Sequence, residues 1–275
     1  MTHGPADVGA RESSSMCSKR KSTTTRSTRF LPLVVMTCLI LLWHLAVSLE
    51  SSHIVPGPWA VLKAIFELAR KGLLLKYVVA SLFRVTWGFL SAVICGVPFG
   101  LFLGWHRRAG MAFNPVLQIL RPISPLAWIP IAILWFGVGD LAGTFLIFLA
   151  SFLPLTMSAM NSVRRIDAVH LNAGRNFGLS TAQLVYRVLF PAVTPQLILG
   201  LRITLGISWL VVVAAEMIAV DSGLGFLIID ARNAGNRYDL VIAAMLLVGL
   251  IGLFLDSGMR RLESLRSIRW GIRSN

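Results

Sequence analysis

Four ionisable residues stand inside long apolar stretches of this sequence, namely Arg84, Arg121, Arg202 and Glu216. Ionisable groups at membrane depth are costly, and they commonly form ion pairs or line a pathway. Arg84 and Arg202 lie near the ends of their stretches, where a long side chain can reach the lipid headgroups. Glu216 lies fourteen residues beyond Arg202, about 21 Å along a helix, so the two cannot pair within one helix. We therefore expect Glu216 to pair with another helix or to stabilise an outer gate, in a structural role.

Arg121 has a different setting, because it stands beside Pro122 in a proline-rich segment. Non-helical backbone at membrane depth is tolerated where protein buries it or where it lines a cavity. Arg121 is therefore a candidate for facing such a cavity.

Catalytic, metal and cofactor chemistry has little support in the sequence. The phosphate-loop pattern GxxxxGK[ST] and the hydrolase patterns HExxH and GxSxG do not occur. The five histidines are scattered, and the three cysteines, Cys17, Cys38 and Cys95, have no CxxC spacing. We expect no catalytic residue, no metal site and no cofactor bound by this chain, so any ATP must be used by a partner.

The composition is that of a membrane protein. Hydrophobic residues make up 56% of the 275 residues and charged residues only 14%, where a soluble domain carries about 25%. Long uncharged runs predict membrane-spanning helices, and they are too long for barrel strands, so an all-α fold is expected. The net charge of +14 suits a nucleic-acid binder, but the basic residues flank apolar runs, which follows membrane topology instead. No nucleic-acid partner is expected.

Six transmembrane helices are predicted. They lie at residues 30–49, 77–104, 113–136, 141–160, 197–220 and 240–255. The third is interrupted in its first half by Pro115, Arg121, Pro122 and Pro125. Residues 58–71 have helical spacing with Trp59, Leu62, Ile65, Phe66 and Ala69 on one side, which indicates either an interfacial helix or a soluble loop helix.

These spans divide the chain into four parts. Residues 1–29 form a disordered basic tail, residues 30–76 the first span with an outer interfacial segment, residues 77–260 the main transmembrane domain, and residues 261–275 a second basic tail. With the N-terminus inside, inner segments hold 17 Lys and Arg residues and outer segments hold 6. This bias predicts a multi-pass protein of the inner (plasma) membrane with both termini cytoplasmic.

Small residues recur every four positions along the second predicted span, at Gly88, Ala92, Gly96, Gly100 and Gly104. Gly200, Thr204 and Ser208 form a shorter series on the fifth. Helices in lipid pack closely where small residues let backbones approach. The series predict either tight packing within one chain or a sliding or dimerising surface.

The loop at residues 161–196 carries the most specific pattern. It runs Asn172-Ala173-Gly174-Arg175-Asn176-Phe177-Gly178 and continues to Val188-Leu189-Phe190-Pro191. The first part predicts a short helix that stops at Gly178. Such a helix is either a solvated loop helix or one that docks in a partner's groove.

This loop resembles the cytoplasmic loop of binding-protein-dependent ABC importer permeases. Their EAA motif reads Glu-Ala-Ala, three residues, Gly, nine residues, Ile-x-Leu-Pro. Asn172, Ala173, Gly174, Gly178 and Pro191 fall at matching positions, with Asn172 in place of Glu and Gly174 in place of the second Ala. Segments 121–130, 134–137, 215–218, 221–225 and 230–232 also resemble the nitrate, sulfonate, taurine and bicarbonate branch, so the likeness covers roughly residues 75–265.

The resemblance implies a type I importer permease core working as a dimer in the lipid membrane, most simply a homodimer. Each copy would dock one ABC ATPase subunit, and a periplasmic or lipid-anchored solute-binding protein would dock on the opposite face. The implied coupling residues are Asn172, Ala173, Gly174, Arg175, Gly178 and Pro191. The candidates for a translocation pathway are Arg121, Ser124, Trp128 and Glu216.

The sequence therefore predicts a permease subunit that moves a small anionic solute by alternating access. ATP would be hydrolysed by the partner subunit and not by this chain. A passive channel and an intramembrane enzyme are the alternatives.

Overall fold

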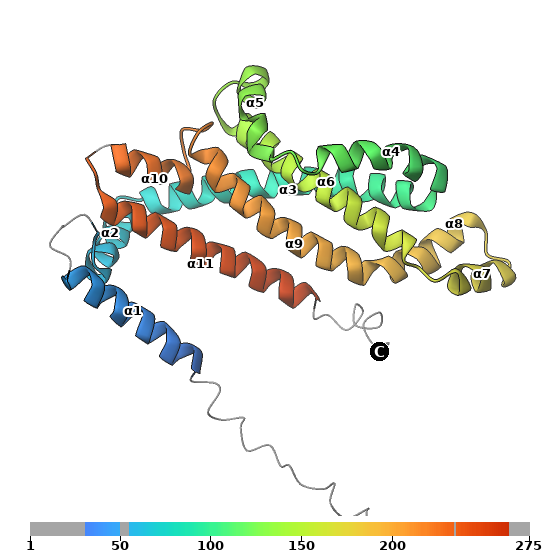
Figure 1. The fold of residues 1–275 in the computed structure, drawn as a ribbon, viewed down its shortest axis with the longest axis horizontal. Coiled ribbons are helices and arrows are strands. Elements are labelled where there is room, and N and C mark those ends of the chain that lie inside the picture. The colour runs from blue at the N-terminus through green and yellow to red at the C-terminus, as the bar shows by residue number, and fades with distance from the viewer. Residues whose placement is uncertain (1–30, 50–54, 234, 264–275) are drawn as a thin grey trace, which may run out of the picture. The chain divides into compact units, whose positions relative to one another are not determined.

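The computed structural model describes residues 31–49, 55–233 and 235–263, and every regular element in these ranges is a helix (Figure 1). The predicted all-α fold is thereby confirmed. The chain divides into two compact units, one ending at Ser52 and one beginning at His53. The first contributes α1 (Leu31–Leu49) and the second all other described helices. The predicted tail at residues 1–29 lies outside the described residues, as does the tail at 261–275 beyond Glu263.

The second unit contains long helices joined by short ones. In chain order these are α2 (Pro58–Arg70), α3 (Leu73–Trp105), α4 (Arg107–Leu120), η2 (Pro125–Trp128), α5 (Ile129–Phe136), α6 (Asp140–Arg164), α7 (Ala168–Asn176), α8 (Thr181–Leu184), η3 (Val185–Leu189), α9 (Phe190–Glu216), α10 (Leu224–Asn233) and α11 (Tyr238–Glu263).

Four stretches are long and apolar enough to cross a membrane, namely α3, α6, the continuous helical run Thr181–Glu216 that includes α9, and α11. The pair formed by α4 and the segment Pro125–Phe136 passes the same test only as a broken span. The described part of α1, Val34–Leu49, is apolar but shorter. The six predicted spans thus correspond to four long helices, one bent pair and one shorter helix.

The third predicted span is bent by 84° between α4 and the segment that begins at Pro125. Ser124 starts the new direction, because its hydroxyl accepts the backbone N–H of Leu126 at 3.3 Å. Pro122 lies in the break, where a missing backbone N–H costs least. The predicted interruption at Pro115 is wrong, since Pro115 lies within α4. A helix in a membrane protein tolerates a proline where neighbouring groups satisfy the freed carbonyl.

The small-residue series on α3 lies against α6 of the same chain. A methyl group at Gly100 would overlap the Thr156 carbonyl oxygen, and one at Gly104 would lie 2.6 Å from Val163 Cβ. Gly88 and Gly96 likewise face the α6 backbone. Thr156 donates a hydrogen bond to the Gly96 carbonyl at 3.3 Å. These glycines therefore occupy an intramolecular contact, which is one of the two roles that the sequence allowed.

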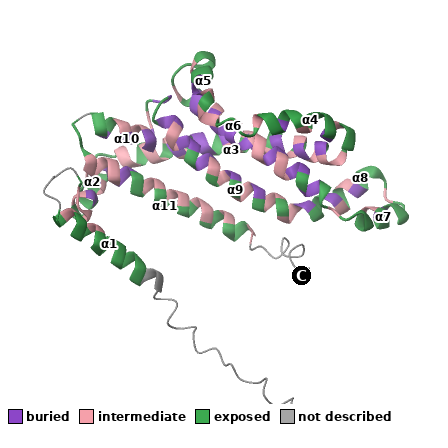
Figure 2. Cartoon of the chain, viewed as in Figure 1, coloured by how far each residue is buried: buried purple, intermediate pink, exposed green. Residues whose placement is uncertain are grey.

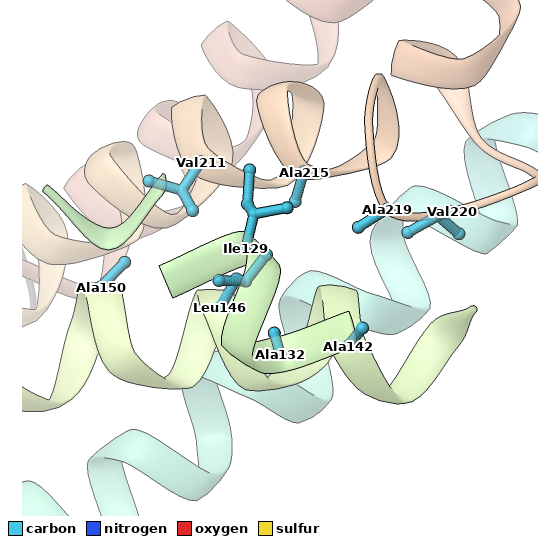
Figure 3. Packing of buried hydrophobic residues seen from close by; sticks show 9 residues of the cluster. All are labelled: Ile129, Ala132, Ala142, Leu146, Ala150, Val211, Ala215, Ala219 and Val220. Atoms are coloured by element: carbon cyan, nitrogen blue, oxygen red, sulfur yellow. The ribbon is translucent and has the colours of Figure 1, made fainter. Parts of the chain in front are cut away.

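The apolar core joins the bent segment to α6 and α9. Figure 3 shows Ile129 and Ala132 of α5 facing side chains from α6 and from the end of α9. The buried members of this cluster are Ile129, Ala132, Ala142, Leu146, Ala150, Val211, Ala215, Ala219 and Val220. Outside it, large apolar side chains remain exposed on the outer faces of the helices (Figure 2). Leu134 of α5 is 81% exposed and Phe254 of α11 is 77% exposed, as expected for surfaces that face lipid.

The helix predicted at residues 58–71 is α2. Its buried residues, Val61, Ala64 and Leu68, lie on its contact with the rest of the unit, while Trp59 and Phe66 on the predicted apolar side are exposed. An exposed apolar face fits the interfacial position, which stays a prediction. Glu67 joins α2 to the loop before α11 through Arg237 at 2.9 Å. The hydrogen bond from Lys71 and, to a smaller extent, the one from Arg237 lower the pKa of Glu67.

Candidate functional site

The helix predicted around residues 172–178 is α7. It ends at Asn176, and Gly178 follows with a φ of +73°, the left-handed conformation that favours glycine. The N–H of Gly178 donates to the Arg175 carbonyl at 2.9 Å, and the N–H of Leu179 donates to the Gly174 carbonyl at 3.2 Å. The predicted stop at Gly178 is confirmed, because the chain reverses there through these two bonds.

The residues of α7 divide between an inner and an outer side. Gly174 is the only buried residue of α7, and a methyl group there would lie 2.6 Å from Leu184 Cδ1. Asn172 and Arg175 are exposed and contact each other at 3.5 Å. Phe177 is 86% exposed. A polar, cationic helix surface beside an exposed aromatic ring is thus left without a partner among the described residues.

The segment after α7 is helical rather than an open loop. Ser180 and Gln183 form a reciprocal capping box at the start of α8, which supplies partners for two free backbone N–H groups. The helix then continues through η3 into α9, where the exposed Pro191 lies in the first turn. The predicted fifth span at 197–220 is therefore longer at its first end and stops at Glu216.

At the opposite end of α9 lies a buried ionic cluster, here called the Arg84 cage. It consists of Ser81, Arg84, Asp140, Glu216 and Ser222. Arg84 Nη1 contacts Glu216 Oε1 at 2.6 Å, and Arg84 Nε donates to Asp140 Oδ1 at 2.7 Å. The side chains of Arg84 and Glu216 are both fully buried. Nη1 also donates to the Ser222 carbonyl, and Nη2 donates to the Ser222 hydroxyl and lies 2.6 Å from Asp140 Oδ1.

Glu216 is satisfied from three sides. Besides Arg84, its carboxylate accepts the Ser81 hydroxyl at 2.9 Å and the Gly225 N–H at 3.0 Å. Gly223 allows this approach: its φ is +108°, and a methyl group there would overlap the Glu216 carboxyl group. The cage therefore binds α3, the start of α6, the end of α9 and the loop before α10 into one unit.

The cage corrects one sequence interpretation and confirms another. Arg84 was expected to extend toward the headgroups, which is wrong, since its side chain is 0% exposed. The predicted pairing of Glu216 with another helix is confirmed by its contact with Arg84 on α3. A pathway role for Glu216 stays a prediction, and both of its oxygens are already engaged. Asp140 and Ser222 were missed, because Asp140 starts a helix outside the predicted spans and Ser222 lies in a loop.

Arg202 also has acidic partners. Its Nε lies 2.7 Å from Asp256 Oδ1 and its Nη1 lies 3.0 Å from Glu263 Oε2, both on α11. The side chain is 24% exposed, so this pair is partly solvated. The expected reach toward headgroups is replaced by an ion pair that joins α9 to α11.

The other predicted pathway residues lie at the bend after α4. Arg121 and Ser124 are exposed, and Trp128 is half-buried. Trp128 lines a cavity of about 140 Å³ together with side chains of α4 and α6. These three residues lie near one another along the bend, whereas Glu216 is engaged with α3. No group of three or more His, Cys, Asp or Glu side chains that could hold a metal ion occurs among the described residues.

Comparison with known proteins identifies the family. Residues 96–267 match the model for binding-protein-dependent transport system inner membrane components. The chain is 32% identical to the taurine transport system permease protein TauC of Escherichia coli, covering 83% of this chain and 85% of that protein. It is 35% identical to the nitrate import permease protein NrtB of Synechocystis, covering 85% and 88%. It is 34% identical to a putative ABC transporter permease of Methanocaldococcus jannaschii, covering 82% and 86%.

A solved structure supports the same fold. A chain of the MetNI methionine ABC transporter superposes with a TM-score of 0.62 at 18% identity, covering 70% of this chain and 94% of that one. The family model begins within α3 and extends past the end of α11. The chain therefore belongs to the binding-protein-dependent transport inner membrane components, the permease subunits of ABC transporters, and has their type I importer fold.

Proposed function

We propose that this chain forms the translocation pathway of an ATP-driven importer for a small anionic solute of the nitrate, sulfonate, taurine or bicarbonate type. The observation that carries the proposal is α7, a short exposed helix held by a left-handed glycine at the end of two membrane helices. Its exposed polar and aromatic side chains suit a groove on a partner. That partner is an ABC ATPase subunit on the cytoplasmic side.

In this mechanism the residues of α7 have two tasks. Asn172, Ala173 and Arg175 are exposed and meet the ATPase, while Gly174 and Gly178 fix the shape of the turn. Pro191 fixes the first turn of α9. When ATP closes the ATPase dimer, α7 moves with it and the helices open outward. ATP shifts the equilibrium because it binds the two states with different affinity.

The solute class rests on the relatives. The similar proteins include a taurine permease and nitrate import permeases. Nitrate is an oxyanion, and taurine carries an oxyanion in its sulfonate group. The solute-binding protein docks at the end that holds the Arg84 cage, and both termini lie in the cytoplasm. Two copies of the chain form the pathway between them, with Arg121, Ser124 and Trp128 of the bend among the residues that line it.

The two alternatives lead to different expectations. A passive channel conducts without ATP, whereas the permease transports only with its ATPase. An intramembrane enzyme needs paired catalytic groups at membrane depth, and the candidate carboxylate, Glu216, is buried and held by Arg84, Ser81 and Gly225. No feature of the described residues favours either alternative over transport.

The test is co-purification of the tagged chain from its native membrane in mild detergent. We expect an ATPase subunit to accompany the chain, and to be lost when residues 172–178 are replaced by a Gly/Ser linker. Gly178→Pro should have the same effect, because proline cannot adopt the φ of +73°. Recovery of the correctly folded chain alone would contradict the proposal.

Gly72→Pro is the matched control. Gly72 also has a positive φ, of +70°, and nothing lies within 4 Å of an added Cβ. Like Gly178, it donates its backbone N–H to the carbonyl of the residue three positions earlier. It begins α3, away from α7. If both variants lose the ATPase equally, the loss reports general damage and the coupling role of α7 is refuted.

A further inference from the structure

A polar groove lies between α6 and α9 near the end that leads to α7, here called the α6–α9 groove. Its volume is about 420 Å³, within the range of about 300–1,000 Å³ that is usual for small-molecule sites. The residues that matter for its chemistry are Ser158, Asn161, Ser162, Arg165, Gln196 and Gly200. Figure 1 shows α6 and α9 side by side as they approach α7.

The groove has unused hydrogen-bond donors. Asn161, Arg165 and Gln196 are exposed, and none of their side chains forms a hydrogen bond or ion pair with another described residue. All three positions fall within residues 161–196, which the charge bias places on the cytoplasmic side. Unpaired polar groups that line one hollow there are hydrated and free to bond a ligand that accepts hydrogen bonds.

The helices α6 and α9 are in close contact at one edge of the groove. Gly200 faces Ser158, and a methyl group at Gly200 would overlap the Ser158 hydroxyl. Farther along α9, the hydroxyls of Ser208 and Ser151 meet at 2.6 Å and hold the helices together. The Ser162 hydroxyl is engaged with the Ser158 carbonyl at 2.7 Å. The helices are thus fastened at Ser208, and the hollow lies beyond that point.

The charge of the groove selects the occupant. Arg165 is its charged residue, and no carboxylate is among its lining residues. A guanidinium with amide N–H donors suits an oxyanion, since charge-assisted hydrogen bonds to anions are about twice as strong as neutral ones. A cation would be repelled by the Arg165 guanidinium. An oxyanion, planar or tetrahedral, is the class that fits.

We propose that the α6–α9 groove is an anion-binding site on the translocation pathway, in which Arg165, Asn161 and Gln196 donate to the transported oxyanion. This inference rests on the proposed function, and it adds residues that the sequence did not single out. The same chemistry would hold a lipid phosphate, because Arg165 follows the last residue of α6. The test below separates the transported anion from a lipid headgroup.

The experiment uses the whole importer, purified with its ATPase and solute-binding protein and reconstituted in phosphatidylcholine vesicles. Uptake of nitrate and of taurine is measured for the natural chain and for Arg165→Gln and Gln196→Leu. We expect the uptake rate of the transported anion to fall about tenfold or more with Arg165→Gln, as for loss of a hydrogen bond to a charged group. Arg164→Gln is the matched control. Arg164 is adjacent to Arg165 and also exposed, but its guanidinium lies against Gly110 of α4 and does not line the groove.

A second measurement reads occupancy directly. In a chain whose own cysteines are replaced by serine, Leu199→Cys, at a lining position that donates no hydrogen bond to the anion, is treated with an anionic thiol reagent in the assembled complex. Saturating transported anion should slow the labelling about tenfold, and chloride at equal ionic strength should not. Equal labelling rates with and without the anion would overturn the proposal.

The outcomes distinguish failure of the groove proposal from failure of the proposed transport function. If the ATPase co-purifies but Arg165→Gln and Arg164→Gln transport equally, the groove proposal fails and the proposed function stands. If no ATPase accompanies the chain, the proposed function itself fails. Uptake is also measured in vesicles that contain anionic phosphatidylglycerol, and a defect of Arg165→Gln that appears only in those vesicles would assign the groove to an anionic lipid headgroup and overturn the proposal.

Discussion

Arg84 and Arg165 show two opposite uses of one side chain in the same helix bundle. Arg84 is fully buried, and its guanidinium is bonded to Asp140, Glu216 and Ser222. Arg165 is exposed in a groove and has no hydrogen-bond or ion-pair partner among the described residues. The first side chain is surrounded by acceptors from its own chain, and the second faces an open hollow lined by further donors.

The difference shows how charge can serve structure or binding in a membrane protein. A buried charge is tolerated only when its partners are complete, and a complete set of partners leaves no donor for a ligand. An exposed charge with free donors contributes little to stability and remains available to an anion. The Arg84 cage thus holds one end of the bundle, while the α6–α9 groove is suited to recognition at the other.

The largest effect is expected from breaking the cage at Arg84. Arg84→Met leaves the Glu216 carboxylate buried without its cation, which should lower the free energy of unfolding by about 3–5 kcal/mol. Thermal unfolding in detergent measures the loss. Arg165→Met should change stability by no more than about 1 kcal/mol, since its side chain is solvated. Equal losses for the two variants would show that Arg84 contributes no more to stability than the solvated Arg165.

A double variant separates the loss of the ion pair from the effect of leaving one buried charge unpaired. Arg84→Met with Glu216→Met removes both buried charges, and Asp140 can be solvated because its side chain is 62% exposed. Replacing a whole buried pair is commonly less harmful than removing one partner. The double variant should therefore be more stable than Arg84→Met alone, and a further loss would show that the cage is not a pair of matched charges.

A smaller effect is expected from crowding the cage without removing a charge. Gly223→Ala places a methyl group against the Glu216 carboxyl group at a φ of +108°, and backbone strain of this kind costs about 1–3 kcal/mol. Gly206→Ala is the control, because nothing lies within 4 Å of its added Cβ and its φ is ordinary. The unfolding temperatures of the two variants should differ, with Gly206→Ala unchanged or higher.

The smallest effect is expected at Arg202, whose partners Asp256 and Glu263 are partly solvated. Arg202→Gln should destabilise the protein less than Arg84→Met, and the loss should shrink as salt is raised from low to high concentration. The loss from Arg84→Met should not depend on salt, because the buried pair is not screened. Unfolding curves at two salt concentrations measure both, and a salt-dependent loss for Arg84→Met would contradict the buried position.

Local chemistry in the sequence was enough to predict much of this protein. The apolar runs predicted the all-α fold, because backbone in lipid must bond within its own helix. The stop of α7 at Gly178 follows from a residue that adopts a positive φ without cost. The bend near Pro122 agrees with the cluster of prolines there, although Pro115 alone does not interrupt α4. Each of these outcomes depends on neighbours within a few positions.

Which charged residues contact one another depends on the tertiary structure. Arg84 and Glu216 are 132 positions apart, and Ser81 is 135 positions from Glu216. Whether they meet depends on the rotation and register of α3 against α6 and α9, which glycines such as Gly88 and Gly100 fix by backbone contact. The free donors of Arg165 and Gln196 are likewise visible only when two helices lie side by side. Composition sets which residues lie in the membrane, and packing sets which of them face one another.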